Sequence, residues 1–444
     1  MNTSNFIRDL GDGLILRRSS SEDIDALAQF NAAIHGEDEL DAIRLAVWTR
    51  DLMRGNHPTF GVGDNTIVED TRSGKIVSSM NLISQTWDYE GIPFKVGRPE
   101  LVGTDPAYRN RGLVRAQFDV VHAWSQERKE LVQGITGIPY YYRQFGYEMA
   151  MNLGGSRLGY APHVPRLEKD QAESYFFRLP EESDLLFLAQ LYQQGCRRSL
   201  VSCVRDAQTW HYEVFGKSPE NVNGLHYRII VNTAGERVGY LAHTGYNGFG
   251  GKVLTAAEFE IVPRAAWLEI SQAAARYLWA TAHKYAENSH AEVSGFGFRL
   301  HVEHPVYTVM KDLLPRERPP YAWYLRVPDM PIFLSQIKSV LEARLAASAL
   351  AGHTGTLDIS FYRAGVRLTF QEGCIAEIAG WKPAPKAEGQ VAFPGLTFLH
   401  ILFGYRTLEE IMHIFPDCWV ADDLVRGLLQ ILFPKKPSNV LALA

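Results

Sequence analysis

Apolar residues recur at strand or helix spacing along most of the chain, and the pattern predicts a mixture of short elements. A strand is predicted at 14–16, and the polar residues 20–23 offer an N-cap and first-turn acids for a helix that follows. Strands are predicted next at 66–68, 75–82 and 100–104, separated by turn-forming residues. The apolar positions of the first helix are Ile24, Leu27, Ala28 and Ile34.

A strand, a polar loop and a helix follow one another closely around residue 110. The strand ends at Thr104, and from Gly112 apolar residues recur at helical spacing up to about Arg128. A short strand is predicted at 131–136, and the alternation at 149–151 is typical of a strand in a core.

The segment 161–325 repeats this order of elements. A strand at 252–261 leads through the turn 262–265 into a long Ala-rich helix that ends near Lys284. This turn contains a proline and no glycine, unlike the loop before Gly112. We interpret the segment as an internal duplication that has lost its loop, and an unrelated α+β domain is the alternative.

A third segment follows the Arg-Glu-Arg-Pro-Pro stretch 316–320, which is typical of a domain edge. It is predicted to begin with a helix and to continue as two alternating strands that turn at 362–365. The capping-box spacing of Thr407 and Glu410 predicts a later helix. The apolar positions are Phe333, Ile337, Val340, Leu341 and Leu345 in the helix, and Leu357, Ile359, Phe361, Val366, Leu368 and Phe370 in the strands.

Length and pattern together predict three domains of α+β class. The chain has 444 residues, and domains typically hold about 100–200 residues each. We place the domains at 1–160, 161–325 and 326–444. Hydrophobic residues make up 46% and charged residues 21%, a balance that allows each segment to bury a core.

Charge and cysteine content restrict the class of function. The formal net charge is −5 and Lys and Arg form no block, which argues against a nucleic-acid partner. The four cysteines are too few for a disulfide framework and too widely spaced for a CxxC metal site. The N-terminus does not resemble a signal peptide, and no apolar run approaches the ~18 residues of a membrane span. We therefore expect a cytoplasmic protein without a membrane span.

The most informative stretch is 100–115, in which a strand ends at a proline turn and a basic glycine loop leads into a helix. Backbone N–H groups converge at a helix N-terminus, where the dipole is positive, so such a loop can bind an anion. Gly112 lets a pyrophosphate approach without a Cβ in the way. Arg109, Arg111 and Arg115 add positive charge. An ordinary turn with solvated arginines has the same spacing, so a second motif is needed.

The second motif is the stretch 137–148, Gly-Ile-Pro-Tyr-Tyr-Tyr-Arg-Gln-Phe-Gly-Tyr-Glu. Together the two stretches resemble the GNAT acyltransferase superfamily, whose acetyl-CoA loop reads Gln/Arg-x-x-Gly-x-Gly/Ala and whose later helix often reads Tyr-x-x-x-Gly-Phe/Tyr. Val114 departs from this pattern, because a small residue usually ends the loop motif. Bulk at this position would tilt the cofactor or lower its affinity.

The order of domains resembles the enhanced intracellular survival family of N-acetyltransferases. The resemblance implies two GNAT-like domains, each a mixed central sheet flanked by helices, the second without a cofactor loop. A sterol-carrier-like α/β domain would follow. The resemblance covers nearly all of the chain, strongly at 97–150 and loosely after it.

This resemblance implies acetyl-CoA as cosubstrate and no metal. Pantetheine would contact the main chain of Val102, Gly103 and Thr104. The pyrophosphate would lie against Asn110, Arg111, Gly112, Leu113, Val114 and Arg115. Further cofactor contacts would come from Gly137 and Ile138.

The same resemblance implies direct acetyl transfer to an amine. Tyr142 falls on the family's general acid, and a tyrosine of pKa about 10 stays protonated at neutral pH. Backbone donors near Val102 would stabilise the oxyanion. The family's base is the C-terminal carboxylate, here that of Ala444. Glu100 is the alternative base, because some GNAT enzymes carry a catalytic glutamate on this strand.

Other residues have simpler interpretations. His301, Glu303 and His304 are too closely spaced for the helical HExxH zinc pattern, and we expect them in a surface turn. Substrate-binding loops are predicted at 36–54 and 84–95. A mixed aromatic and acidic lining there, suited to a cationic amine, would consist of Trp48, Asp51, Trp87 and Asp88.

Two classes of function remain open on the sequence alone. The first is an N-acetyltransferase acting on aminoglycoside-like, polyamine-like or lysine amines, in a homo-oligomer that the resemblance implies to be a hexamer. The second is a non-catalytic regulatory protein that binds a lipid or small ligand on a GNAT scaffold. Only the first GNAT-like segment keeps the glycine loop, and this contrast favours an active first domain.

Overall fold

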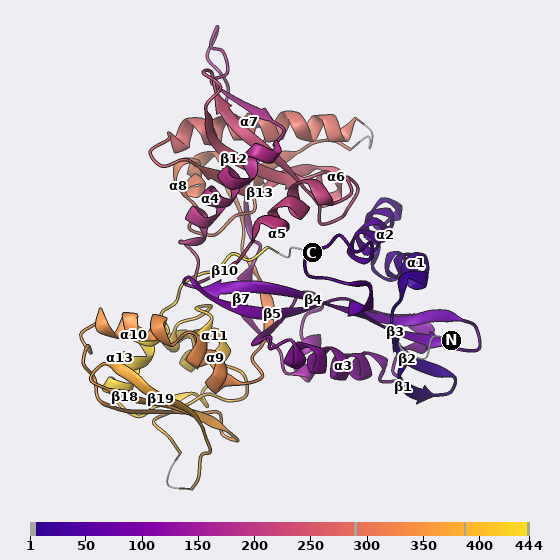
Figure 1. Ribbon diagram of the computed structural model, residues 1–444. Helices are drawn as coiled ribbons and strands as arrows, with labels where there is room; N and C mark the ends of the chain where they lie inside the picture. The colour runs from indigo at the N-terminus through magenta and orange to yellow at the C-terminus, as the bar shows by residue number, and fades with distance from the viewer. Residues whose placement is uncertain (1–5, 288–290, 386–387, 442–444) are drawn as a thin grey trace.

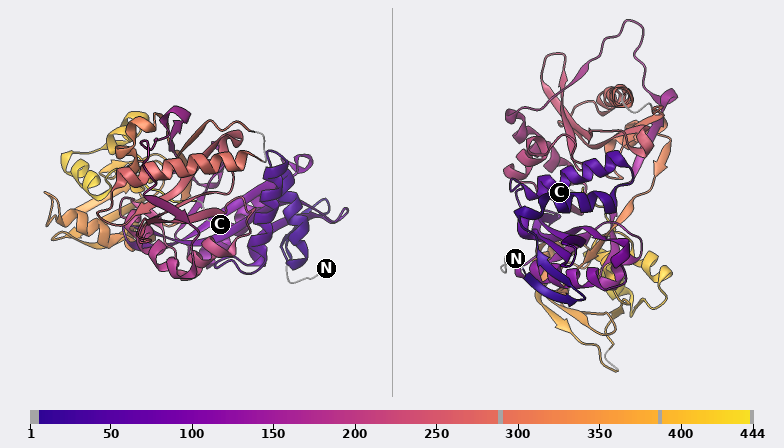
Figure 2. Two further views of the ribbon diagram at one scale, coloured as in Figure 1. Left: turned by 90° about the horizontal axis from the view of Figure 1, so that it is seen from above. Right: turned by 90° about the vertical axis from the view of Figure 1, so that its right-hand side faces the viewer.

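The computed structural model describes residues 6–287, 291–385 and 388–441, which form three sheets. Each sheet contains both antiparallel and parallel strand pairs, and helices pack against the sheets, so the predicted α+β class is confirmed. The first domain lies between the other two, with the second domain above it and the C-terminal domain below it in the right-hand view of Figure 2.

The first sheet has the strand order β1-β2-β3-β4-β5-β6-β16-β7, and β10 pairs with β4. Leu82 packs with α3 on one face, whereas the adjacent Ile83 packs with α1 and α2 on the other (Figure 1). The helices are α1 (Ile24–His35), α2 (Glu39–Met53) and α3 (Leu113–Glu127). The strands are β1 (Phe6–Gly11), β2 (Leu14–Arg18), β3 (Asn65–Asp70), β4 (Lys75–Tyr89), β5 (Ile92–Thr104), β6 (Val132–Ile135), β7 (Glu148–Leu153), β10 (Val201–Cys203) and β16 (Tyr321–Arg326).

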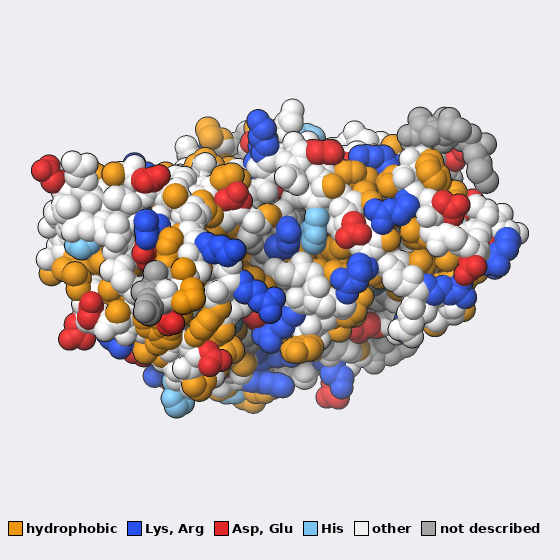
Figure 3. Space-filling model, turned by 90° about the horizontal axis from the view of Figure 1, so that it is seen from below, with side chains coloured by type: hydrophobic (Ala, Val, Ile, Leu, Met, Phe, Trp, Pro, Cys, Tyr) orange, Lys and Arg blue, Asp and Glu red, His pale blue; other side chains and the backbone are white. Residues whose placement is uncertain are grey.

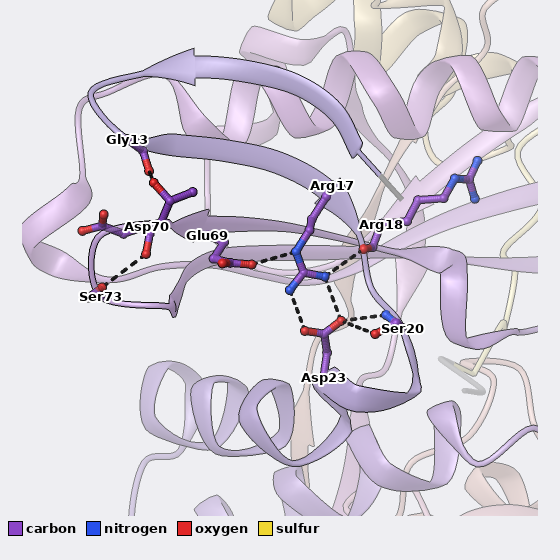
Figure 4. A network of polar contacts seen from close by, with 9 residues as sticks. Gly13, Arg17, Arg18, Ser20, Asp23, Glu69, Asp70 and Ser73 are labelled. Carbon is purple, nitrogen blue, oxygen red and sulfur yellow. Dashed lines mark hydrogen bonds and ion pairs between the residues drawn. The ribbon is translucent and has the colours of Figure 1, made fainter. Parts of the chain in front are cut away.

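An ion-pair network fixes the start of α1 against this sheet. Arg17 on β2 donates to the two carboxylate oxygens of Asp23 at 2.7 and 2.8 Å and to Glu69 on β3 at 2.8 Å (Figure 4). Asp23 also accepts from the backbone N–H of Ser20 at 2.7 Å. The polar residues before α1 therefore begin the helix as predicted, and they join it to two strands.

The second sheet has the order β15-β8-β14-β13-β12-β11-β9. The long helix α7 (Trp267–Ala286) packs against β13 and β14, as the sequence pattern predicts. The other helices are α4 (Leu185–Cys196), α5 (Ala207–His211), α6 (Gly248–Gly251) and α8 (Pro305–Val309). The strands are β8 (Ser156–Tyr160), β9 (Tyr175–Arg178), β11 (Leu225–Asn232), β12 (Arg237–Thr244), β13 (Val253–Ile261), β14 (Gly295–Phe298) and β15 (Arg316–Arg318).

The first two domains exchange strands. β8 follows the first domain in sequence but pairs with β14 and β15 of the second sheet. β16 follows the second domain and pairs with β6 and β7 of the first sheet. The division of the chain at residues 160 and 325 remains a proposal, and sheet membership refines it by assigning β8 to the second domain and β16 to the first.

The C-terminal sheet has the order β19-β18-β17-β20-β21. The helix predicted at its start is interrupted at Ile337, although all five of its predicted apolar residues are buried. The capping box is present, because Thr407 and Glu410 exchange hydrogen bonds of 2.8 and 3.1 Å. The elements are α9 (Met330–Gln336), α10 (Lys338–Ala346), β17 (Gly355–Ser360), β18 (Gly365–Gln371), β19 (Cys374–Trp381), β20 (Val391–Ala392), α11 (Phe398–Leu402), α12 (Leu408–Ile414), β21 (Trp419–Val420) and α13 (Asp423–Leu432).

The core of the C-terminal domain is continuous with the first sheet. Leu357 and Val366 belong to the same buried cluster as Trp87 and Val96 of β4 and β5. Among the described residues, no helix has the length and apolar character needed to cross a membrane.

Candidate active site

β5 and β6 are parallel neighbours over a short stretch and then separate. Val96 pairs with Val132 and Gly97 with Gln133, where the register ends. Further along β5 the pairing with β4 shifts by one residue, and Leu101 adopts a φ of 50°. Such a bulge bends a strand. The main chain of 102–104 therefore lies beside a gap between the two strands, where an extended ligand can hydrogen-bond to it.

The loop between β5 and α3 has the backbone of an anion site. Asn110 and Gly112 are left-handed, with φ of 62° and 75°, and α3 begins at Leu113. Gly112 is the N-cap and supplies no side-chain cap, so the N–H groups of the first turn are available to a ligand. A Cβ built on Gly112 meets no atom within 4 Å, which leaves the approach to these groups open.

A contact that the sequence did not indicate anchors the loop. The hydroxyl of Tyr108 donates to Asp70 at the end of β3 at 2.7 Å. Asp105 accepts from the N–H of Ala107 at 2.8 Å, which closes the first turn of the loop. Asp70 and Tyr108 are 38 residues apart. Neither forms a motif, so only the folded chain reveals the pair.

The three arginines of the loop region lie on the surface. Arg109, Arg111 and Arg115 are exposed, and Arg111 lies 5.1 Å from the centre of the Tyr108 ring. Arg115 donates to Gln144 at 3.0 Å and so connects α3 to the aromatic stretch. Figure 3 views the molecule from the side on which α3 lies in Figure 1, and Lys and Arg side chains gather across the middle of this face.

Tyr142 lies beside Gly137 in a short turn that follows β6. The turn is a 3-10 helix, Tyr141–Phe145, rather than the α-helix of the resembled motif. Tyr142 is 4% exposed and packs edge-on against Phe118 of α3 and Tyr324 of β16. Gly137 has a φ of 126°, and a Cβ built there would lie 3.4 Å from the Tyr142 hydroxyl.

Glu100 influences the protonation of Tyr142. Burial raises the pKa of Tyr142, and the nearby charge of Glu100 raises it further. Burial also raises the pKa of Glu100, although the ion pair with Arg98 opposes the shift. The structure thus brings the predicted acid and the alternative base into one site, with the phenol protonated at neutral pH.

The last described residues of the chain reach Trp323, which lies beside Arg98. The indole N–H of Trp323 on β16 donates to the carbonyl of Val440 at 3.1 Å, and Val440 is 2% exposed. Arg98 lies 5.1 Å from the centre of the Trp323 ring. Ala444 lies outside the described residues, so its carboxylate remains a prediction.

The residues expected to line a substrate pocket do not form an open lining. The predicted loop 36–54 is mostly helix α2, and 84–95 belongs to the paired strands β4 and β5. Trp48, Asp51 and Trp87 are 6%, 2% and 0% exposed, because they pack between elements of the first domain or against the second domain. Asp51 accepts hydrogen bonds from the backbone and hydroxyl of Ser218, and Asp88 accepts one from Ser202.

A cleft between the first two domains is the better candidate for an acceptor site, and the sequence did not predict it. It is lined by His57 and Pro58, by 84–86 of β4, and by Tyr212 and Glu213 of the second domain. Burial, followed by the charges of Lys217 and Arg98, lowers the pKa of His57 to about 3. The imidazole is therefore neutral at physiological pH.

The prediction that His301 and His304 lie in a surface turn is wrong. They are 5% and 2% exposed. His304 Nε2 lies 2.8 Å from the Phe259 carbonyl, and His301 Nε2 lies 3.3 Å from that of Pro437, so both rings are fixed inside the protein. Within the described ranges, His, Cys, Asp and Glu form no group of three or more that would hold a metal ion.

Comparison with known proteins agrees with this geometry. Residues 16–150 match the family model of the acetyltransferase (GNAT) domain. None of the curated proteins matches the chain in sequence. The chain therefore carries an acetyltransferase domain of the GNAT class, and GNAT acetyltransferases use acetyl-CoA.

The likeness to solved structures extends over the whole chain. A probable N-acyltransferase from Enterococcus faecalis is 13% identical, with a TM-score of 0.63 and 96% of this chain and 98% of that chain covered. A GCN5-related N-acetyltransferase from Kribbella flavida is 16% identical, with a TM-score of 0.62 and 99% of each chain covered. Eis1 from Mycobacterium abscessus is 14% identical, with a TM-score of 0.57 and 96% and 98% covered. The domain match supports an N-acetyltransferase. The solved structures show that the whole chain shares their fold.

Proposed function

We propose that the protein transfers the acetyl group of acetyl-CoA to a primary amine by direct attack, without a metal. The observation that carries this proposal is the convergence of three features at one place. These are the uncapped glycine loop at Gly112, the gap between β5 and β6, and the buried phenol of Tyr142. These features would suit, in turn, the pyrophosphate, the pantetheine chain and the thioester of acetyl-CoA.

The proposed binding mode follows the gap. The main chain of Val102, Gly103 and Thr104 would bind pantetheine as a neighbouring strand does. The N–H groups of 110–115 would bind the pyrophosphate, supported by the exposed arginines. Gly137 and Ile138 would border the thioester end, because Gly137 lies against Tyr142. Val114 is half-buried, so its extra bulk relative to the usual small residue lies partly in the helix packing.

The chemistry is acyl transfer through a tetrahedral intermediate. The neutral amine nitrogen attacks the thioester carbonyl carbon, and backbone donors near Val102 stabilise the oxyanion. The C–S bond then breaks, and Tyr142 gives its proton to the departing thiolate. A base takes the proton released by the amine. The same proton equivalent then returns to Tyr142 and restores its phenol. Because burial raises the pKa of Tyr142, the phenol carries its proton throughout the neutral pH range.

We propose the C-terminal carboxylate of Ala444 as that base, with Glu100 as the alternative. Two contacts support this choice. The tail reaches Trp323 next to Arg98, and the carboxylate of Glu100 is already engaged by Arg98 as its ion-pair partner. Glu100→Gln separates the two possibilities, because it abolishes turnover only if Glu100 is the base.

The acceptor is proposed to be a small polyamine-like or aminoglycoside-like amine or a lysine side chain, bound in the cleft beside His57. A homo-oligomer, by resemblance a hexamer, a cytoplasmic location and a sterol-carrier-like C-terminal domain remain proposals. The alternative of a lipid-binding regulator has less support, because the strands of the C-terminal sheet bury their apolar residues in a core shared with β4 and β5.

Release of free CoA thiol in the presence of a panel of amines tests the proposal, with mass spectrometry of the acceptor as the second readout. We expect acetyl-CoA-dependent acetylation of at least one polycationic amine. Binding of acetyl-CoA without turnover on polyamines, aminoglycosides or lysine peptides would contradict it.

A further inference from the structure

The last described residues of the chain run between the first and second domains. In Figure 1 the yellow end of the chain leaves the C-terminal domain and passes β10. The N–H of Leu200 donates to the Pro437 carbonyl at 3.0 Å, and the N–H of Val201 donates to the Ser438 hydroxyl at 3.1 Å. With the bond from Trp323 to Val440, groups at β10 and β16 of the first sheet hold the tail at three positions within four residues.

The second domain contributes a cavity to this path. β13 pairs with β14 only as far as Ala256, so its last five residues border a gap like the one beside β5. Two glutamates on this stretch form ion pairs, the buried pair Arg205–Glu258 and the partly exposed pair Arg198–Glu260. A cavity lined by these four side chains and by His301 is also lined by Asn439 and Leu441 of the tail.

We propose that the gap of the second domain does not bind a cofactor and instead positions the C-terminal tail. We call this tail-binding site the socket. His301 and Trp323 are its positioning residues, since His301 holds the carbonyl of Pro437 and Trp323 holds that of Val440. The inference rests on the proposed function of the terminal carboxylate as base. This role would explain why β13 and β14 separate in a domain that has no glycine loop.

The fixed stretch of tail supports this role. Hydrogen bonds at the Pro437 and Val440 carbonyls hold the last described residues beside His301 and Trp323. A tail released at these two points would sample a far larger volume, and the fraction of time spent near the amine would fall.

Two conservative substitutions test the socket in the full-length protein. Trp323→Phe removes the N–H donor and keeps an aromatic ring, and His301→Asn keeps an acceptor for the Glu303 N–H but loses the donor to Pro437. Since one hydrogen bond contributes about 0.5–1.5 kcal/mol, we expect kcat to fall about 3- to 10-fold in each variant and further in the double variant. Trp279→Phe and His283→Asn on α7 make the same chemical changes away from the tail and are the matched controls.

The pH profile separates positioning from a general loss of structure. Without a positioned base, turnover depends on amine that solvent has already deprotonated, so the defect should shrink as pH rises toward the pKa of the acceptor amine. Acetyl-CoA affinity should stay within about twofold of wild type, because the glycine loop is untouched. A chain lacking residues 442–444 should show the same pH-dependent defect, and the socket variants should add little to it.

The outcomes distinguish this inference from the proposed function. Socket variants with full kcat at neutral pH, in a protein that acetylates amines and loses activity in Tyr142→Phe, would overturn the socket and leave the acetyltransferase proposal standing. A defect of the same size at every pH would also overturn it. If the wild-type protein acetylates no amine, the proposed function itself is wrong. The control variants Trp279→Phe and His283→Asn would then also show no acetylation.

Discussion

β5 with α3 and β13 with α7 are two versions of one structural unit. Each consists of a long strand that separates from a parallel neighbour and leads into a helix. In the first domain the connection contains left-handed Asn110 and Gly112, and the gap lies beside the polar groups of Glu100 and Tyr142. In the second domain the connection is 262–266, with Pro263 and no glycine, and the unpaired end of β13 carries the ion-paired Glu258 and Glu260.

The difference teaches that the fold provides the gap and that a few residues decide its use. A gap that must admit a pyrophosphate needs free N–H groups and no Cβ in front of them. A gap that only supports the fold can be filled by paired charges, because buried charges are tolerated when they are paired and hydrogen-bonded. The predictions below alter each version in turn.

The largest effect is expected from breaking an ion pair in the second gap. Arg205 and Glu258 are 2.6 Å apart with side chains 1% and 5% exposed. Glu258→Gln leaves the guanidinium without its counter-charge, which typically costs about 3–5 kcal/mol of unfolding free energy. Urea denaturation measures this loss of unfolding free energy. The exposed Arg50–Asp25 pair is the control, and Asp25→Asn should cost less than about 1 kcal/mol. A Glu258→Gln loss as small as the control would show that the pair does not hold the second gap together.

Removal of the phenol in the first gap is the next largest effect. Tyr142→Phe should lower kcat by about 10²-fold with little change in acetyl-CoA affinity, as expected for a group that transfers a proton. Steady-state kinetics with saturating acetyl-CoA measures the change. Tyr140, which is 75% exposed, provides the control Tyr140→Phe with near-normal kcat. Equal kcat in wild type and Tyr142→Phe would exclude Tyr142 as the acid.

A smaller effect is expected from closing the approach to the glycine loop. Gly112→Leu should weaken acetyl-CoA binding about 10-fold or more, because its side chain enters the open space in front of the first-turn N–H groups. The left-handed φ of 75° adds backbone strain of about 1 kcal/mol. Gly235→Leu is the matched control, since Gly235 has a φ of 79° and equally open surroundings in the second domain. Titration calorimetry compares the two variants, and an equal affinity in both would contradict the loop assignment.

The smallest expected effect is the change of kcat at alkaline pH. The general acid must be protonated, and burial raises the pKa of Tyr142 above its ordinary value of about 10. Activity governed by Tyr142 is therefore lost only as pH rises through this raised pKa. The kcat profile should stay flat from about pH 8 to pH 10. A fall in kcat with a midpoint below pH 9, in a protein that is still folded, would show that another group supplies the proton.

The sequence predicted those parts of the fold and site that depend on local patterns. The strand, loop and helix around Gly112 follow from turn chemistry and helical spacing, and the capping box at Thr407 follows from two residues three positions apart. The exchange of β8 and β16 between sheets was not predictable, because strand pairing is decided by distant partners. The burial of Trp87 and of His301, and the cleft beside His57, likewise arise only where separate domains pack together.

Counting acetyl-CoA molecules bound per chain tests the central claim most directly. Calorimetric titration of the full-length protein should give one site, because only the first gap combines an uncapped helix N-terminus with open space at Gly112. The single site should be weakened in Gly112→Leu and unchanged in Glu258→Gln at a temperature where that variant is folded. Two sites per chain, or one site that survives Gly112→Leu with full affinity, would contradict the claim that the first gap alone serves acetyl transfer.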